Sequence, residues 1–160
     1  MIADIINQQD DYKIPTTFLR KNVKGLLKAT LSLKISNKAL NKKLSTIDKL
    51  NINLVFVTAE HIKSLNSDFR SKNKPTDVLS FSSFDPECLG ELIFCPEVIV
   101  ANAKDNKWAQ KYEYLYMLVH GYLHLLGLDH EVESEAKAMF SLQDQIFNKL
   151  SPKEKVILKK

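Results

Sequence analysis

Hydrophobic residues recur along this chain with two different periods, which separate the predicted helices from the predicted strands. Residues 15–29 place apolar side chains at helical spacing with lysines on the opposite face, so we expect an amphipathic helix there. The run Ile-Asn-Leu-Val-Phe-Val at 52–57 is rich in β-branched and aromatic residues, which is typical of a strand. Thr58 can then cap a helix that continues to about Phe69.

The middle of the chain predicts a β-hairpin. Residues 77–81 and 90–95 both have the composition of strands, and the segment between them contains Asp85-Pro86, which is typical of a turn. Two strands joined by a short turn most simply pair with each other. We therefore expect an antiparallel pair.

After Pro96 the pattern is helical for most of the remaining chain. We place helices near 97–105, 108–126 and 132–149. Strands in the middle with helices on both sides predict an α+β fold, in which the helices pack around a small mixed β-sheet. Because no repeat and no Ser/Gly/Pro-rich linker divides the sequence, we expect a single domain over residues 1–160.

The composition fits a folded protein of the reducing cytoplasm. The 160 residues are 44% hydrophobic and 26% charged, which excludes a disordered or collagen-like chain. No apolar run approaches the roughly 18 residues of a membrane span, and the first residues do not resemble a secretory signal. We therefore expect a cytoplasmic protein with no membrane partner, in which Cys88 and Cys95 are reduced.

The charge is modest but unevenly distributed. The net charge is +4, and residues 1–50 hold 10 Lys and Arg against 4 Asp and Glu, whereas residues 77–100 hold 5 acidic residues and no Lys or Arg. A basic surface of this kind could hold a phosphate backbone, although a solvated lysine-rich face is the simpler interpretation. Arginine occurs only at Arg20 and Arg70, so a guanidinium able to bind phosphate through two donors is rare in this chain.

Three of the four histidines lie in one window, His120-Gly-Tyr-Leu-His124-Leu-Leu-Gly-Leu-Asp-His130. His120 and His124 stand one turn apart on the same face of a predicted helix. Gly127 permits the left-handed turn that ends this helix, which lets His130 return toward the same point. Three imidazoles leave one position open for water, as in a catalytic zinc site, and nickel or copper would also suit these ligands. We therefore expect one Zn²⁺ or other transition metal per chain at the end of a central helix.

The window also resembles the H-E-x-x-H-x-x-G-x-x-H motif of zinc peptidases, with one informative difference. Gly121 stands where those enzymes carry the glutamate that acts as general base. The chemistry must therefore differ from theirs. His61, isolated in the first turn of another predicted helix, is expected to be an ordinary surface residue.

The complete histidine string resembles the HGxLHLxGxDH signature of the YbeY family of metal-dependent endoribonucleases. Residues 65–81 resemble a second element of that family, N-x-x-[FY]-R-x-x-x-x-P-T-[DN]-V-L-S-F, and Gly90-Glu91-Leu92-Ile93 is similar to its G-[DE]-hydrophobic-hydrophobic strand. The similarity covers roughly residues 50–150. It departs at Leu128, where the family commonly has an aromatic residue.

This resemblance implies a single-strand-specific endoribonuclease that acts in ribosomal RNA processing, notably at the 3′ end of 16S rRNA, and in ribosome quality control. It implies single-stranded RNA and the ribosome or its small-subunit proteins as partners. It also assigns His120, His124 and His130 to the metal and Arg70 to the active site.

We expect specific roles for four residues near the proposed metal. A metal ion lowers the pKa of bound water toward about 7, and Arg70 would neutralise the charge that develops on the phosphate. Lys72 and Lys74 would extend the phosphate-binding surface. Asp129 either orients a histidine N–H or caps the helix that follows it.

The sequence leaves two other functions open. One is a zinc hydrolase of another ester or amide, and the other is a ribosome-associated RNA-binding factor whose metal is structural. Four tyrosines could stack on RNA bases, although aromatic residues at helical spacing more often pack in the core: Tyr112, Tyr114, Tyr116 and Tyr122. The general base, the oligomeric state and the cleavage site are not predicted.

Overall fold

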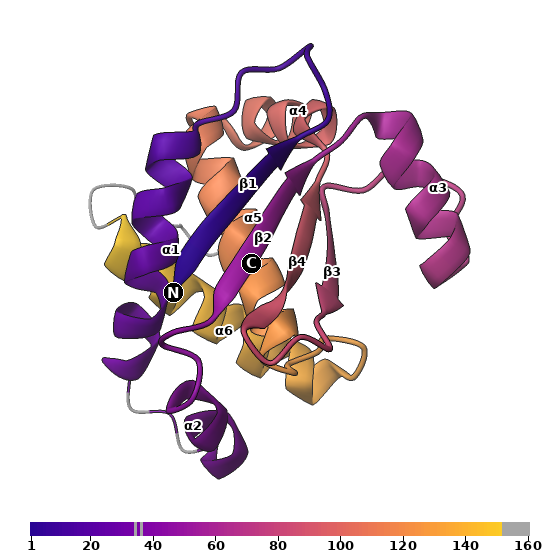
Figure 1. The fold of residues 1–160 in the computed structure, drawn as a ribbon. Coiled ribbons are helices and arrows are strands. Elements are labelled where there is room, and N and C mark those ends of the chain that lie inside the picture. Colours follow the sequence, from indigo (N-terminus) through magenta and orange to yellow (C-terminus); the bar gives the residue numbers. More distant parts are fainter. Residues whose placement is uncertain (34, 36, 152–160) are drawn as a thin grey trace.

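The computed structural model describes residues 1–33, 35 and 37–151, so the end of the expected domain, residues 152–160, lies outside the described residues. The chain forms a mixed β-sheet with helices packed against it (Figure 1), which confirms the predicted α+β fold. In chain order the elements are β1 (Ile2–Asn7), α1 (Thr16–Leu31), α2 (Lys38–Leu44), β2 (Asn51–Phe56), α3 (Ala59–Arg70), β3 (Val78–Ser82), β4 (Cys88–Phe94), α4 (Pro96–Asn106), α5 (Gln110–Leu125) and α6 (Glu133–Leu150).

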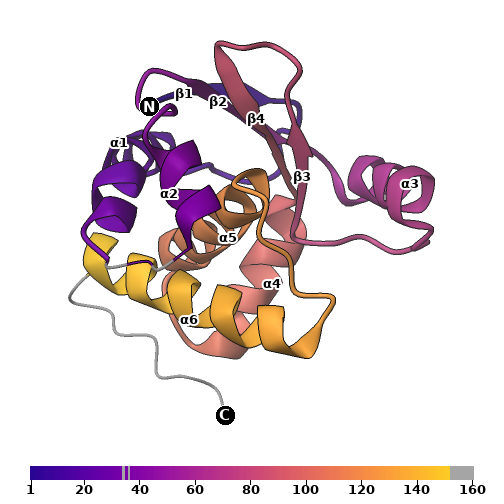
Figure 2. The ribbon, with the colours of Figure 1, turned by 90° about the horizontal axis from the view of Figure 1, so that it is seen from below.

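The sheet has four strands in the order β1-β2-β4-β3. Strands β1, β2 and β4 run parallel to one another. Strand β3 pairs antiparallel with β4, from Val78 opposite Phe94 to Ser82 opposite Gly90. The predicted hairpin is therefore confirmed. Seen from below, α1, α4, α5 and α6 lie on one side of the sheet, and α3 lies beyond its β3 edge (Figure 2).

Two elements were not predicted. Strand β1 contains Asp4 and Asn7, and its parallel partner β2 begins more than 40 residues later in the chain, so no local pattern marks it. Helix α2 has seven residues, which is too short for a clear period, and Asn37 caps it by accepting a hydrogen bond from the Leu40 N–H at 3.0 Å. This helix still supports the centre of the fold, because Lys43 Nζ donates to the Leu125 carbonyl at the end of α5 at 2.7 Å.

Helix α5 crosses the core and comes very close to the sheet at Gly121. A Cβ atom at this position would lie 2.6 Å from Leu92 Cδ2 and 3.2 Å from Ser80 Oγ, which is too short for a normal contact. Gly121 therefore lacks a side chain for a packing reason. A glutamate of the zinc-peptidase kind would not fit between this helix and strands β3 and β4.

Most of the tyrosines belong to the core, as helical spacing suggested. Tyr114 and Tyr122 are fully buried, and the half-buried Tyr112 and Tyr116 pack against Phe147 of α6 with ring centroids 6.5 and 5.7 Å apart. Cys88 is partly buried and Cys95 is buried, and both are free cysteines in the structure. Among the described residues, no helix combines the length and the apolar character needed to cross a membrane.

Candidate metal centre and active site

The end of α5 sets the positions of the candidate ligands. Gly127 has φ 93°, its N–H donates to the His124 carbonyl at 2.8 Å, and the Leu128 N–H donates to the Leu123 carbonyl at 3.0 Å. These two bonds form the Schellman motif that ends helices in a left-handed turn. The left-handed turn predicted at Gly127 is confirmed, and Leu128 packs against the core immediately after it.

The three histidines of the window come together in space. One ring nitrogen from each of His120, His124 and His130 lies within 4.8 Å of the other two. The Nε2 atoms of His120 and His124 are 3.2 Å apart, and the His130 ring lies 5.3 and 5.1 Å from the His120 and His124 rings between centroids. Two nitrogens bound to one tetrahedral zinc ion at about 2.0–2.1 Å would lie roughly 3.3–3.4 Å apart. The cluster therefore fits a single metal ion.

Burial keeps two of these imidazoles in the neutral form that binds metals. It lowers the pKa of His120 below its ordinary value. Burial, together with the neighbouring His120 and His130, lowers the pKa of His124 to about 4. Because a metal ion binds only the deprotonated ring nitrogen, these two histidines need release no proton at neutral pH before an ion binds.

Asp129 lies beside the cluster and not at the start of the next helix. Its Oδ1 accepts a hydrogen bond from the backbone N–H of His130 at 2.7 Å and lies 4.0 Å from His124 Nδ1. Helix α6 begins after Val132 and has no side-chain cap. The interpretation of Asp129 as a helix cap is therefore wrong, and its carboxylate lies near Nδ1 of His124, whose Nε2 faces His120.

Arg70 is the last residue of α3, and Ser71, with φ 54°, ends the helix directly after it. The exposed guanidinium makes no hydrogen bond or ion pair with a described residue. Its positive charge contributes, as the smallest cause, to the lowered pKa of both His120 and His124. The fold thus brings Arg70 into electrostatic range of the histidines.

Lys72 and Lys74 lie exposed in the loop between α3 and β3. The buried Asn66 shapes this loop, since its Nδ2 donates to the Lys74 carbonyl at 2.8 Å and its own carbonyl accepts from the Lys72 N–H at 3.2 Å. Within the described part of the chain, neither lysine makes a hydrogen bond or ion pair with the histidines. They follow Arg70 by two and four residues and extend the positive charge of its loop.

Two residues of α6 reach the cluster and were missed from the sequence. Gln143 is fully buried, with its Oε1 2.9 Å from His120 Nδ1. The Phe140 ring stacks beside His130 and His120, with centroids 5.5 and 6.2 Å away. A signal for Gln143 did exist, because it is a polar residue on the apolar stripe of a predicted helix, between Met139 and Ile146.

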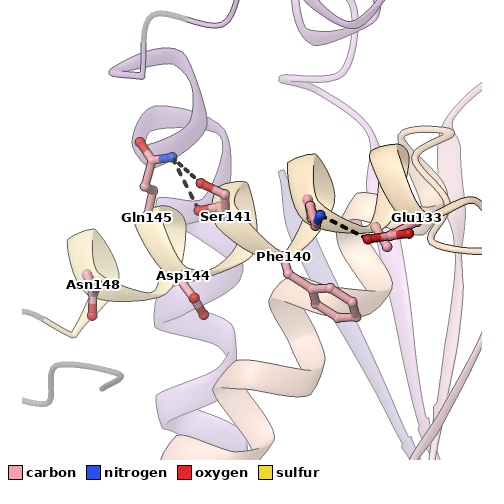
Figure 3. A pocket seen from close by; sticks show the side chains of 8 residues that line it. Glu133, Phe140, Ser141, Asp144, Gln145 and Asn148 are labelled. Carbon is pink, nitrogen blue, oxygen red and sulfur yellow. Dashed lines mark hydrogen bonds and ion pairs between the residues drawn. The ribbon is translucent and has the colours of Figure 1, made fainter. Parts of the chain in front are cut away.

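A shallow groove of about 560 Å³ follows one face of α6, with Phe140 near the middle of its lining (Figure 3). The described residues that line it are Glu133, Ala136, Lys137, Phe140, Ser141, Asp144, Gln145 and Asn148. Its lining combines charged and polar side chains with the aromatic ring of Phe140, which also lies beside His130 and His120. The groove therefore lies next to the metal cluster without containing the histidines.

Comparison with known proteins identifies the family. The sequence profile described as "Endoribonuclease YbeY" matches residues 4–151, which is nearly the whole described chain. The chain belongs to the YbeY family. The match begins at residue 4, so it extends the resemblance of residues 50–150 over the first third of the chain.

Curated YbeY proteins from several bacteria are similar to this chain in sequence. The endoribonuclease YbeY of Bdellovibrio bacteriovorus is 48% identical over 103 residues, which cover 64% of this chain and 69% of that protein. The endoribonuclease YbeY of Thermodesulfovibrio yellowstonii is 36% identical over 161 residues, covering 94% of this chain and 98% of that protein. The solution structure of TM1509 from Thermotoga maritima has a TM-score of 0.56 at 28% identity and covers 93% of this chain and 89% of that one. YbeY relatives therefore share both the sequence and the fold.

Proposed function

We propose that this chain is a single-strand-specific metallo-endoribonuclease that acts in ribosomal RNA processing, including maturation of the 16S rRNA 3′ end, and in ribosome quality control. The observation that carries the proposal is the cluster of His120, His124 and His130, whose ring nitrogens lie within 4.8 Å of one another. Membership of a family of endoribonucleases supports RNA as the substrate. Nothing in these findings favours a hydrolase of another substrate or a factor with a structural metal.

The cofactor of the proposed reaction is one Zn²⁺ per chain, held by the three histidines. When bound, such an ion supplies Lewis acidity at the phosphate and a water of lowered pKa. The histidines would bind the ion through their neutral rings, and for this reason they are not available as general bases. Gly121, one residue after His120, has no side chain that could act as a base either.

Arg70 is proposed to bind the non-bridging oxygens of the scissile phosphate. A guanidinium can donate two parallel hydrogen bonds to a phosphate, and these strengthen as negative charge develops on its oxygens. The absence of a hydrogen bond or ion pair to any other described residue supports this role, because the group need not break a contact in order to bind. Lys72 and Lys74 would hold the flanking phosphates as point charges, and Asp129 would accept the Nδ1–H of His124.

A single strand is the preferred substrate for a physical reason. A flexible backbone can bend its scissile phosphate toward a half-buried cluster, whereas an A-form duplex holds each phosphate in a fixed geometry. Ribosomal RNA, together with the ribosome or its small-subunit proteins, is the proposed cellular partner. The cytoplasm is the proposed location.

The proposal is tested by offering three substrates to the zinc-loaded protein. It should cleave an unstructured RNA internally, cleave the same sequence poorly in a duplex, and leave denatured protein intact. RNA binding, measured apart from cleavage, should weaken with added salt, because phosphate contacts release counterions. Chelator-sensitive proteolysis would favour the other hydrolase. RNA binding without metal-dependent cleavage would favour the non-catalytic factor.

A further inference from the structure

One polar side chain of helix α6, that of Gln143, contacts the three-histidine cluster. Gln143 has no exposed surface, and both ends of its amide have a partner. Its Oε1 lies 2.9 Å from His120 Nδ1, and its Nε2 donates to the Tyr116 carbonyl at 3.4 Å. The Gln143 amide thus links the Tyr116 carbonyl of α5 to the His120 side chain, four residues further along the same helix.

These two contacts determine which ring nitrogen of His120 carries the proton. The Tyr116 carbonyl can only accept, so the NH₂ end of the Gln143 amide must face it. The oxygen end then faces His120, and since an amide oxygen can only accept, Nδ1 must be the donor. A neutral imidazole has a single N–H, which leaves the lone pair on Nε2, the atom 3.2 Å from His124 Nε2.

We propose that Gln143 is a positioning residue that fixes the Nδ1–H tautomer of His120 and so prepares Nε2 to bind the metal. The inference rests on the proposed metal site and names a second residue needed to form it. Partners of this kind raise the basicity of a ligating histidine, and their loss typically costs 10- to 100-fold in metal affinity. A glutamine that only filled space would have neither effect.

The tautomer is measured directly by long-range ¹H–¹⁵N correlation spectra of the metal-free protein near neutral pH. Wild-type His120 should carry its proton on Nδ1, and in Gln143→Leu this preference should be lost. Zinc affinity, measured by competition with a chromogenic chelator, should fall 10- to 100-fold in Gln143→Leu. Gln143→Glu keeps an acceptor at this position and should restore both properties.

Gln145→Leu is the matched control, because Gln145 lies on the exposed face of the same helix and, among the described residues, forms hydrogen bonds only with Ser141. It should keep the wild-type tautomer and zinc affinity. A proton on Nε2 in wild-type His120, or equal zinc affinity in folded Gln143→Leu and Gln145→Leu, would overturn the inference. If Gln143→Leu does not fold, the wild-type spectrum and the rescue by Gln143→Glu still decide it. Failure of the wild type itself to bind zinc would instead refute the proposed metal site.

A different observation concerns the aromatic ring at the edge of the cluster. Phe140 is 42% exposed, although it is a large apolar residue on a packed helix. Its ring is nearly parallel to those of His130 and His120, at interplanar angles of 24° and 19°. Phe140 lines the groove along α6 (Figure 3), and its ring also lies beside the three-histidine cluster.

We infer that Phe140 stacks on the base of a nucleotide adjacent to the scissile phosphate. Single-stranded nucleic acids bind to proteins through such stacking at about 1–3 kcal/mol per base, with little sequence preference. Tyr114 and Tyr122 are buried and cannot take this role. The inference rests on the proposed function, since it requires a single strand to lie across the histidines.

The test compares RNA with and without bases. Single-stranded RNA should bind Phe140→Leu roughly 5- to 150-fold more weakly than the wild type in the presence of chelator, where no cleavage occurs. Phe140→Tyr should bind as the wild type does. An abasic RNA of the same length and charge should bind all three proteins equally. Equal binding of ordinary RNA by folded Phe140→Leu would overturn the stacking role, whereas failure of the wild type to bind any single strand would refute the proposed function.

Discussion

At the scale of single residues, the centre depends on a few nitrogen atoms whose protonation the fold controls. His120 and His124 are half-buried, which lowers the pKa of both, and their Nε2 atoms lie 3.2 Å apart. Two lone pairs at this distance repel each other unless a cation or a proton lies between them. The same burial that lowers the pKa of these histidines therefore favours metal binding at neutral pH.

Removal of one ligand should abolish tight metal binding. His124→Ala leaves two histidines, which lose both one bond to the ion and the geometry of the site. Elemental analysis of the purified variant should find much less than one metal ion per chain. His61→Ala is the matched control, because His61 is exposed in the first turn of α3, and it should retain the wild-type content. Full metal occupancy in His124→Ala would refute the three-histidine site.

Arg70→Lys tests the role of the guanidinium. Lysine keeps the charge but loses the two parallel donors, so the cleavage rate should fall on the order of 10²-fold or more while folding and metal content stay unchanged. The same exchange at Arg20, an exposed residue of α1, should leave the rate unaffected. A wild-type rate in Arg70→Lys would show that Arg70 is only a surface residue.

The pH dependence of stability follows from the lowered pKa of His124. In the unfolded chain this group has its ordinary pKa of 6.5, whereas in the folded chain the pKa is about 4. Between these values the unfolded state binds more protons, so the free energy of unfolding of the metal-free protein should fall as the pH falls from about 6.5 to about 4. Urea unfolding at several pH values measures this slope. His124→Ala should show a shallower slope, and an equal slope would contradict the assignment.

At the scale of the elements, the pattern of the sequence predicted most helices and strands and missed two. Long periodic segments such as α5 and α6 carry many apolar contacts and are therefore marked along their whole length. Strand β1 and helix α2 are stabilised by partners far away in the chain, so the pattern of their own residues gives little indication of their secondary structure. The convergence of the three histidines was predicted because they lie within eleven residues, and a single turn at Gly127 brings them together.

Gly121 provides a test of how closely α5 must approach the sheet. Gly121→Val would add three carbon atoms at a position where even a single Cβ would lie 2.6 Å from Cδ2 of the fully buried Leu92. Overpacking of this kind typically costs about 1–3 kcal/mol, so the free energy of unfolding measured in urea should fall by about this amount. An unchanged free energy would mean that the helix can move away from the strands without cost.

At the scale of the whole molecule, the proposed site joins segments that are distant in the sequence. The histidines come from α5 and the turn after it, Gln143 and Phe140 come from α6, and Arg70 comes from the end of α3 beyond the edge of the sheet. A sequence pattern records spacing within one element but not the packing of one element on another. For this reason the convergence of the three histidines was predicted, whereas the glutamine and the phenylalanine that contact them were not.

The most direct test of the account is the rate of single-stranded RNA cleavage as zinc is returned to the metal-free protein. The rate should rise in proportion to the zinc added and stop rising at about one ion per chain, and His61→Ala should follow the same course. His120→Ala, purified in the same way, should stay inactive at every zinc concentration. Cleavage by the metal-free protein, or by His120→Ala, would contradict a reaction that depends on the three-histidine centre.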